Sequence, residues 1–222
     1  PVDLDFLIVQ KMYLGLWICA LEADPVSSPC ALGLNVHSSD WGLLFSRLDK
    51  NPNWLAGDMS AYDYSQKAQS IGAFLRLFDS TTDPLLLPRD AAHRVIELTF
   101  MGYHIIGGLV FFRPWGTSSG SYITSIFGTF YNWYVHYQAF TALYPGGDFA
   151  RVQCTFTGDD SVVTVPDDYK DFNMSYLRDY LLSHCGMTYT SPDKTDVMSI
   201  GKADVVYLKR TFRPVGNRIM AP

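Results

Sequence analysis

Two groups of aspartates carry side chains that could do chemistry together. Asp58 and Asp63 follow a short apolar run, and Asp159 and Asp160 lie between two β-rich runs. No Lys or Arg separates the members of either group. If the groups met in the fold, the carboxylates would repel one another unless a divalent cation neutralised them. Oxygen ligands suit Mg²⁺ or Mn²⁺, and two such ions can stabilise the attacking and leaving oxygens of a phosphoryl transfer.

The second group has a simpler interpretation that must be kept beside the first. Gly-Asp-Asp is a good turn sequence, so on its own it predicts no more than a hairpin. The chemical interpretation is strengthened by the order of several motifs along the chain. They are Asp58-x4-Asp63, Ser119-Gly120-x3-Thr124, Gly158-Asp159-Asp160, Lys194 and Leu208-Lys209-Arg210.

Alternating elements are expected to position these residues. Apolar residues at helical spacing and cap residues predict helices at 41–48, 65–79, 90–100, 121–143 and 173–186. Short β-rich runs predict strands at 54–56, 105–106, 109–111, 152–156, 161–165 and 205–208. Two pairs of these runs are joined by turn sequences, Gly107-Gly108 and the stretch 157–160, and are predicted to form hairpins. Helices alternating with antiparallel hairpins indicate the α+β class.

Composition narrows the protein class. The 222 residues carry a net charge of −5, with 48% apolar and 18% charged residues, which excludes a polycationic arm and a disordered chain. No apolar run looks long enough to span a membrane. The four cysteines, with no paired metal-ligand spacing, indicate reduced thiols of a cytosolic protein, and the five histidines are scattered. Pro1 in place of Met suggests a fragment or a processed product.

The motifs resemble those of RNA-dependent RNA polymerases of picorna-like positive-strand RNA viruses. The matching stretches are 34–41, 57–63, Ser119-Gly120 with Thr124, 157–160, 186–190 leading to Asp193-Lys194, and 207–210. The resemblance implies a catalytic core fragment over 1–222: a palm, an antiparallel sheet backed by helices, at 51–79 and 116–213, with fingers segments at 1–50 and 80–115. The N-terminal fingers and the thumb would lie outside it.

The resemblance also implies roles for the acidic residues. Asp58 and Asp159 would bind two Mg²⁺ or Mn²⁺ ions, with Asp160 in support. Asp63 would sense the ribose 2′-hydroxyl, the group that distinguishes RNA precursors from DNA precursors. As an alternative, Asp63 is simply a negative charge at a helix N-terminus.

Further roles follow for the loop and helix after Pro114. Ser119 and Thr124 would orient the sugar of the NTP, and Gly120 would approach the RNA; a plain loop with a helix cap is the alternative. Where the family usually carries Asn, this chain has Gly128. Asn132, one helical turn further on, is the candidate substitute for the ribose contact.

Basic residues complete the expected site. Lys194 would protonate the pyrophosphate leaving group, unless it is a solvated surface charge beside Asp193 and Asp196. Lys209 and Arg210, with Tyr207 and Phe212, would grip the primer through its phosphates.

The sequence thus predicts a viral RNA-directed RNA polymerase acting in the host cytoplasm, within a viral replication complex. Its expected partners are an RNA template, a primer or product strand, NTPs and other viral replication proteins, without a direct membrane span. Two alternatives stay open: a reverse transcriptase with the same palm carboxylates, and a non-catalytic scaffold module. The turn at 157–160 and Asp63, where a bulky gate would be expected for dNTPs, argue against the first, and the intact carboxylates argue against the second.

Overall fold

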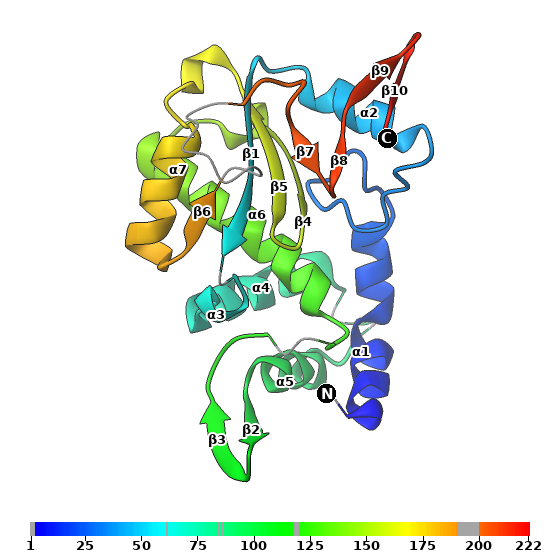
Figure 1. The fold of residues 1–222 in the computed structure, drawn as a ribbon. Coiled ribbons are helices and arrows are strands. Elements are labelled where there is room, and N and C mark those ends of the chain that lie inside the picture. The colour runs from blue at the N-terminus through cyan, green and yellow to red at the C-terminus, as the bar shows by residue number, and fades with distance from the viewer. Residues whose placement is uncertain (1–2, 61, 84, 86, 118–119, 191–199) are drawn as a thin grey trace.

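A computed structural model describes residues 3–60, 62–83, 85, 87–117, 120–190 and 200–222 (Figure 1). The helices are α1 (Leu4–Glu22), α2 (Asp40–Leu48), α3 (Tyr62–Ser65), α4 (Ala68–Thr81), α5 (Arg89–Phe100), α6 (Thr124–Leu143) and α7 (Met174–Tyr180). The strands are β1 (Asn53–Ser60), β2 (Gly102–Ile106), β3 (Leu109–Arg113), β4 (Gln153–Thr157), β5 (Asp160–Val165), β6 (Thr188–Thr190), β7 (Val206–Tyr207), β8 (Arg210–Thr211), β9 (Arg213–Val215) and β10 (Arg218–Met220). Helices and antiparallel strands alternate, so the predicted α+β class is confirmed.

A four-stranded antiparallel sheet in the order β4-β5-β1-β6 forms the centre of the molecule. Successive side chains of a strand point to opposite faces, and both faces of β1 are buried. Leu55 and Met59 pack into the larger core, which includes α6, whereas Trp54 and Ala56 pack into a second core with α2 and the β7–β8 hairpin. In Figure 1, α6 runs behind the sheet. The sheet is therefore held rigidly between two apolar layers.

Strand β1 extends further than its sequence predicts. The expected strand covered 54–56 and ended at Gly57-Asp58, since Gly and Asp are poor strand formers. In the structure β1 continues to Ser60, because Asp58, Met59 and Ser60 pair with β6. Asp58 is consequently a strand residue and not a residue of the following loop.

Helix α1 is missed by the sequence analysis and changes one expectation. Its apolar residues surround the whole helix, so it has no amphipathic pattern; only Asp3, whose side chain accepts from the Asp5 amide, marks its start. The helix is long and apolar enough to cross a membrane by length and composition, contrary to the expectation that no such segment exists. The same is true of core helices in soluble proteins, and Leu14, Trp17 and Ile18 are buried here.

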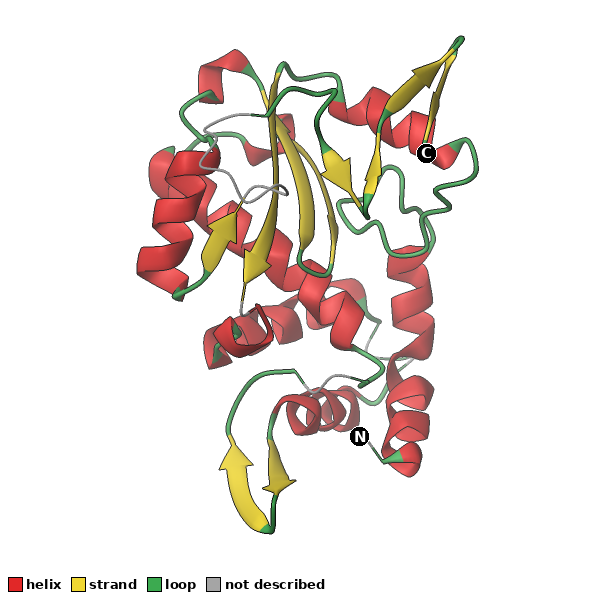
Figure 2. Ribbon diagram, viewed as in Figure 1, coloured by secondary structure: helices red, strands yellow, loops and turns green. Residues whose placement is uncertain are grey.

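The β2–β3 hairpin forms as predicted and projects from the body below α5 (Figure 2). Gly107 and Gly108 supply the positive φ angles of its turn, 55° and 82°. Large apolar side chains on both of its strands are exposed, including Ile105, Leu109 and Val110. The hairpin at the C-terminal end, β9–β10, was not predicted, although its turn contains Gly216 followed by Asn217.

Candidate active site

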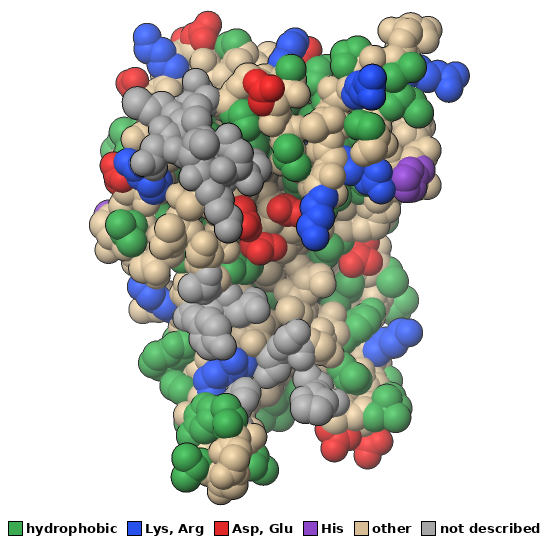
Figure 3. Space-filling model, in the orientation of Figure 1, with side chains coloured by type: hydrophobic (Ala, Val, Ile, Leu, Met, Phe, Trp, Pro, Cys, Tyr) green, Lys and Arg blue, Asp and Glu red, His purple; other side chains and the backbone are tan. Residues whose placement is uncertain are grey.

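The pairing of β1 with β5 brings the two groups of aspartates together. Gly57 lies opposite Ser161, so one further step along the same register makes Asp58 and Asp160 neighbours, and Asp159 follows in the β4–β5 turn. By strand alternation, Asp58 and Asp160 share the face on which Trp54, Ala56 and Val162 pack. Asp58 and Asp159 are exposed and Asp160 is half-buried. Figure 3 shows acidic side chains gathered near the middle of this face, next to a basic one.

Electrostatics show that the three carboxylates interact. Burial, with smaller contributions from the negative charges of Asp159 and Asp58, raises the pKa of Asp160 to about 6, and the positive charge of Lys209 partly opposes these effects. Among the described residues, no three His, Cys, Asp or Glu side chains already stand as a metal-ligand set. The donors are nevertheless all carboxylate oxygens that repel one another, which is the chemistry of a divalent-cation site. A cation would draw them together.

The acidic turn is a two-residue hairpin turn held by the backbone of Gly158 and Asp159. Thr157 pairs with Asp160, and Gly158 has a φ of 60° at the first turn position, as a type II′ turn requires. Helix α6 contacts this turn from the opposite face. The Gly158 amide donates to Thr129 Oγ1 over 2.9 Å. Asn132 Nδ2 lies 3.0 Å from the Gly158 carbonyl oxygen, 2.9 Å from that of Asp159 and 3.4 Å from that of Asp160.

Gly128 explains how α6 comes so close. A Cβ at this position would lie 3.4 Å from the Tyr62 ring and 3.5 Å from the Gly158 Cα. Tyr62 also donates a hydrogen bond through its hydroxyl to the Gly128 carbonyl. The departure from the family pattern therefore coincides with the place where the helix, the turn and Tyr62 come together, and a Cβ there would be in van der Waals contact with both neighbours.

Asn132 is placed differently from its sequence-based expectation. As a substitute ribose contact it would have to reach a nucleotide, yet the side chain is fully buried. Its amide faces the backbone of the acidic turn, behind the carboxylates. This arrangement makes Asn132 part of the support of the turn, and its contact with a ribose stays a prediction.

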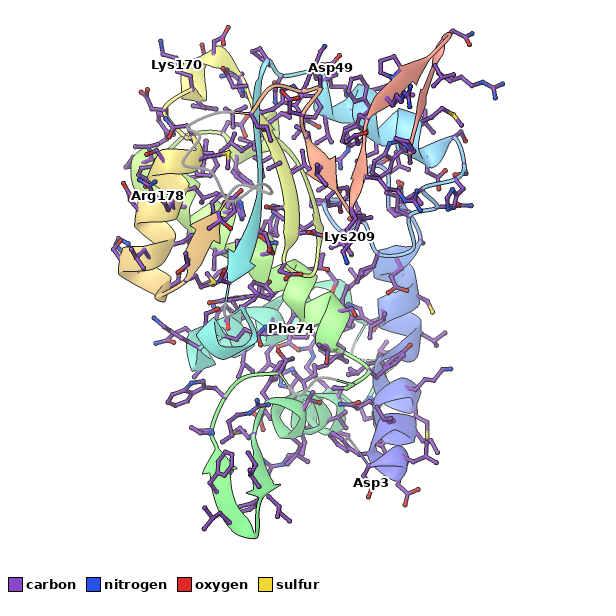
Figure 4. The ribbon with its side chains drawn as sticks, viewed as in Figure 1. Asp3, Asp49, Phe74, Lys170, Arg178 and Lys209 are labelled. Atoms are coloured by element: carbon purple, nitrogen blue, oxygen red, sulfur yellow. The ribbon has the colours of Figure 1, made fainter. Side chains whose placement is uncertain are left out.

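Lys209, labelled in Figure 4, lies in the turn of a second hairpin, β7–β8, and its positive charge lowers the pKa of Asp160. The two turn residues of this hairpin, Leu208 and Lys209, have φ angles of 51° and 59°. Residues other than Gly and Asn rarely adopt this left-handed region. Tyr207 fixes this hairpin: its hydroxyl shares a 2.6 Å hydrogen bond with Thr157 Oγ1, and its ring stacks on Trp41. The basic tip and the acidic tip are thus tied to each other just beneath their ends.

Other predicted site residues lie apart from this cluster or outside the described residues. Arg210 Nη1 lies 3.3 Å from the Pro222 carbonyl oxygen, so its guanidinium is directed toward the C-terminal end. Thr124 is the half-buried first residue of α6, and Gly120 is exposed with a φ of 92°. Asp63 lies in α3, directly after β1, but the description does not extend to its side chain. Ser119 and Lys194 lie outside the described residues.

Sequence analysis missed three supporting residues. Thr129 gave no local signal, because a threonine inside an apolar helix is unremarkable. Tyr62 lies between Asp58 and Asp63 in the sequence, and nothing in that stretch predicts its hydrogen bond to Gly128. Tyr189 lies directly over Gly57, so that a Cβ on Gly57 would overlap its ring. Only the contact between distant strands reveals why position 57 is a glycine.

Comparison with solved structures identifies the fold. The fold aligns with the Sicinivirus 3Dpol RNA dependent RNA polymerase at a TM-score of 0.80, over 96% of this chain and 45% of that one. The two sequences are 19% identical, so this similarity shows a shared fold. An antiparallel sheet backed by helices, with aspartates on adjacent strands, is thus the core of a viral polymerase fold.

The family follows from the sequence. Residues 2–222 match the family model of the viral RNA-dependent RNA polymerases, and the chain belongs to that family. It is 30% identical over 224 aligned residues to the genome polyprotein of Rice tungro spherical virus (strain Vt6), covering 94% of this chain, and 27% identical to the replication polyprotein of Nora virus, covering 86%. The chain spans only 6% and 10% of these polyproteins. The resemblance recognised in the sequence is confirmed.

Proposed function

We propose that this chain is the catalytic core of a viral RNA-directed RNA polymerase, which transfers a nucleoside monophosphate from an NTP to the 3′ end of an RNA strand. One observation carries the proposal: Asp58 and the Asp159–Asp160 pair, about a hundred positions apart, meet on adjacent strands. Phosphoryl transfer needs little covalent chemistry from the protein, and its catalysis rests on positioning and on stabilising charge.

Asp58 and Asp159 would hold two divalent cations in this proposal. Both side chains are exposed, whereas half-buried Asp160 would support them. Bound Mg²⁺ would lower the cost of ionising the 3′-hydroxyl and neutralise charge on the phosphates. The rigid sheet would keep the carboxylates in place, because β1 is buried on both faces.

The remaining roles come from family likeness. Lys209 would contact the phosphates of the primer end, and its neighbour Arg210 would support the same strand. Asp63, Ser119 and Thr124 would orient the ribose, Gly120 would approach the RNA, and Lys194 would protonate the pyrophosphate. Acting within a replication complex in the host cytoplasm, alongside other viral proteins, is part of the same proposal.

Primer extension on an RNA template by the complete protein tests the proposal. Asp159→Asn keeps the size of the side chain and removes its charge. We expect nucleotide addition to fall at least about a thousandfold, which is roughly 4 kcal/mol of transition-state stabilisation. Asp90→Asn, an exposed aspartate on α5, is the matched control and should leave the rate unchanged.

Two results would redirect the interpretation. Preferred incorporation of dNTPs on the RNA template would favour the reverse-transcriptase alternative. An inactive wild-type protein that still binds RNA would favour the scaffold alternative.

A further inference from the structure

The acidic turn occupies a position that needs support. It ends a hairpin, so the backbone groups of residues 158–160 lie at the limit of the strand ladder. Asp159 is exposed at its tip, and its negative charge is close enough to that of Asp160 to raise the pKa of Asp160. Repulsion between carboxylates pushes the tip away from any arrangement that brings their oxygens together.

Two side chains of α6 hold four backbone groups of this turn. Thr129 accepts from the Gly158 amide, and Asn132 Nδ2 faces the carbonyl oxygens of Gly158, Asp159 and Asp160. The two residues are three positions apart and therefore project from the same side of the helix. All four contacts approach from the face opposite the carboxylates, so the support leaves the chemical face open.

The burial of Asn132 indicates that this arrangement has a purpose besides packing. Its side chain is fully buried, and Oδ1 finds no hydrogen-bond partner within the described residues. A buried acceptor without a partner destabilises a fold. An apolar residue of similar size would avoid that cost, but it could not hold the carbonyls of the turn.

We infer that Asn132 and Thr129 are positioning residues that hold the Asp159 turn from behind and so set the affinity of the carboxylates for divalent cations. The inference rests on the proposed function. It also assigns Asn132 a role other than ribose selection, since the side chain supports the ligand and does not touch the nucleotide. Residues that orient metal ligands in this way commonly contribute 10- to 100-fold to metal affinity or activity, by order of magnitude.

Metal binding tests the inference without relying on activity. Mn²⁺ titration of the complete protein, followed by the electron paramagnetic resonance signal of free Mn²⁺, gives the affinity directly. We expect Asn132→Ala to weaken Mn²⁺ binding by about 10-fold or more. In primer extension, the Mg²⁺ concentration for half-maximal rate should rise similarly, while the preference for ribo- over deoxy-NTPs stays unchanged.

Thr129 offers a milder pair of variants should Asn132→Ala unfold. Thr129→Val keeps the shape and removes the hydroxyl that accepts from Gly158, whereas Thr129→Ser keeps the hydroxyl. Weaker Mn²⁺ binding in the Val variant, restored in the Ser variant, would support the inference. Asn173→Ala, which removes the cap of α7 away from the turn, controls for loss of stability alone.

Unchanged Mn²⁺ affinity in folded Asn132→Ala and Thr129→Val proteins would overturn the inference. A changed ribose preference with unchanged metal affinity would return Asn132 to the sugar-contact role. These outcomes are separate from failure of the proposed function, in which the wild-type protein adds no nucleotides although Mn²⁺ binding still reports on the turn.

Discussion

Two hairpin tips meet at the candidate active site, and they solve the same geometric problem differently. The acidic tip, Gly158-Asp159, uses a glycine where its turn needs a positive φ. The basic tip, Leu208-Lys209, places two residues with side chains in the left-handed region. Such residues cost of order 1–3 kcal/mol each and persist only where the surroundings impose them.

The difference shows where each tip gets its geometry. The acidic tip is held through its own backbone by α6, so its position is defined at the turn itself. The basic tip is held through Tyr207, which binds Thr157 and stacks on Trp41 one residue before the turn. The basic tip has backbone strain in its two turn residues, whereas the acidic tip has repulsion between its carboxylates.

Removing the charge of half-buried Asp160 at the acidic tip should have the largest effect. The pKa of Asp160 is raised to about 6 from an ordinary value of 3.8, so the folded protein disfavours its ionisation. This contribution to stability is present below about pH 4 and is lost as pH rises through 6. Asp160→Asn should therefore unfold at higher urea than wild type at pH 7.5 without metal. Because Asp160 is half-exposed, we expect the free energy of unfolding to increase by about 1–2 kcal/mol.

The comparison with the variant is essential here, because a second group titrates in the same range. Burial lowers the pKa of His136 to about 4, so its contribution changes in the opposite direction and is lost as pH falls. The contribution of His136 is the same in both proteins, so it cancels when the free energy of unfolding of wild type is subtracted from that of Asp160→Asn. This difference in stability should shrink toward pH 4 and when Mg²⁺ is added at pH 7.5. A difference that depends on neither would contradict a cost of ionising Asp160 caused by burial and by its acidic neighbours.

Cutting the anchor of the basic tip should have the next largest effect. Tyr207→Phe removes a buried hydroxyl that contacts Thr157 and Thr155 at 2.6 and 3.3 Å. We expect a loss of about 1 kcal/mol in the free energy of unfolding and weaker binding of a primed RNA template. Urea denaturation and fluorescence anisotropy measure the two. Tyr103→Phe, on the exposed β2–β3 hairpin, should change neither.

Relieving the strain of the basic tip should have the smallest effect on stability. Lys209→Gly suits a φ of 59°, so we expect a gain of roughly 0.5 kcal/mol, reduced from the strain itself by the flexibility of Gly when unfolded. RNA affinity should drop, and its dependence on salt should weaken by about one phosphate contact. Gly158→Ala makes the inverse change and should cost stability. A less stable Lys209→Gly protein would show that the tip is unstrained.

The sequence predicts local features of this fold better than distant contacts. The β2–β3 and β4–β5 hairpins follow from Gly-containing turns, and α2, α4 and α5 follow from the helical spacing of their apolar residues. The Leu208-Lys209 turn has no such signal, since its conformation is imposed by the core around Tyr207. Helix α1 has no polar face, so its sequence shows no alternation of apolar and polar residues at helical spacing.

The site was predictable in its residues but not in its construction. Resemblance identified Asp58, Asp159 and Asp160, yet which strands are neighbours depends on pairing across about a hundred residues, which no local pattern encodes. The burial of Asn132 was equally hidden, because the polar residues of α6 are spread around the helix and mark no single exposed face. The family resemblance predicted which carboxylates take part, and only the three-dimensional structure shows which residues of α6 hold the acidic turn.

Gly57, covered by the ring of Tyr189, has a consequence for how the chain assembles. A slip of β1 by one residue against β6 would bring a side chain beneath that ring, where there is room for none. The same slip would also turn Asp58 to the wrong side of the sheet. The glycine therefore favours the single register in which Asp58 shares a face of the sheet with Asp160.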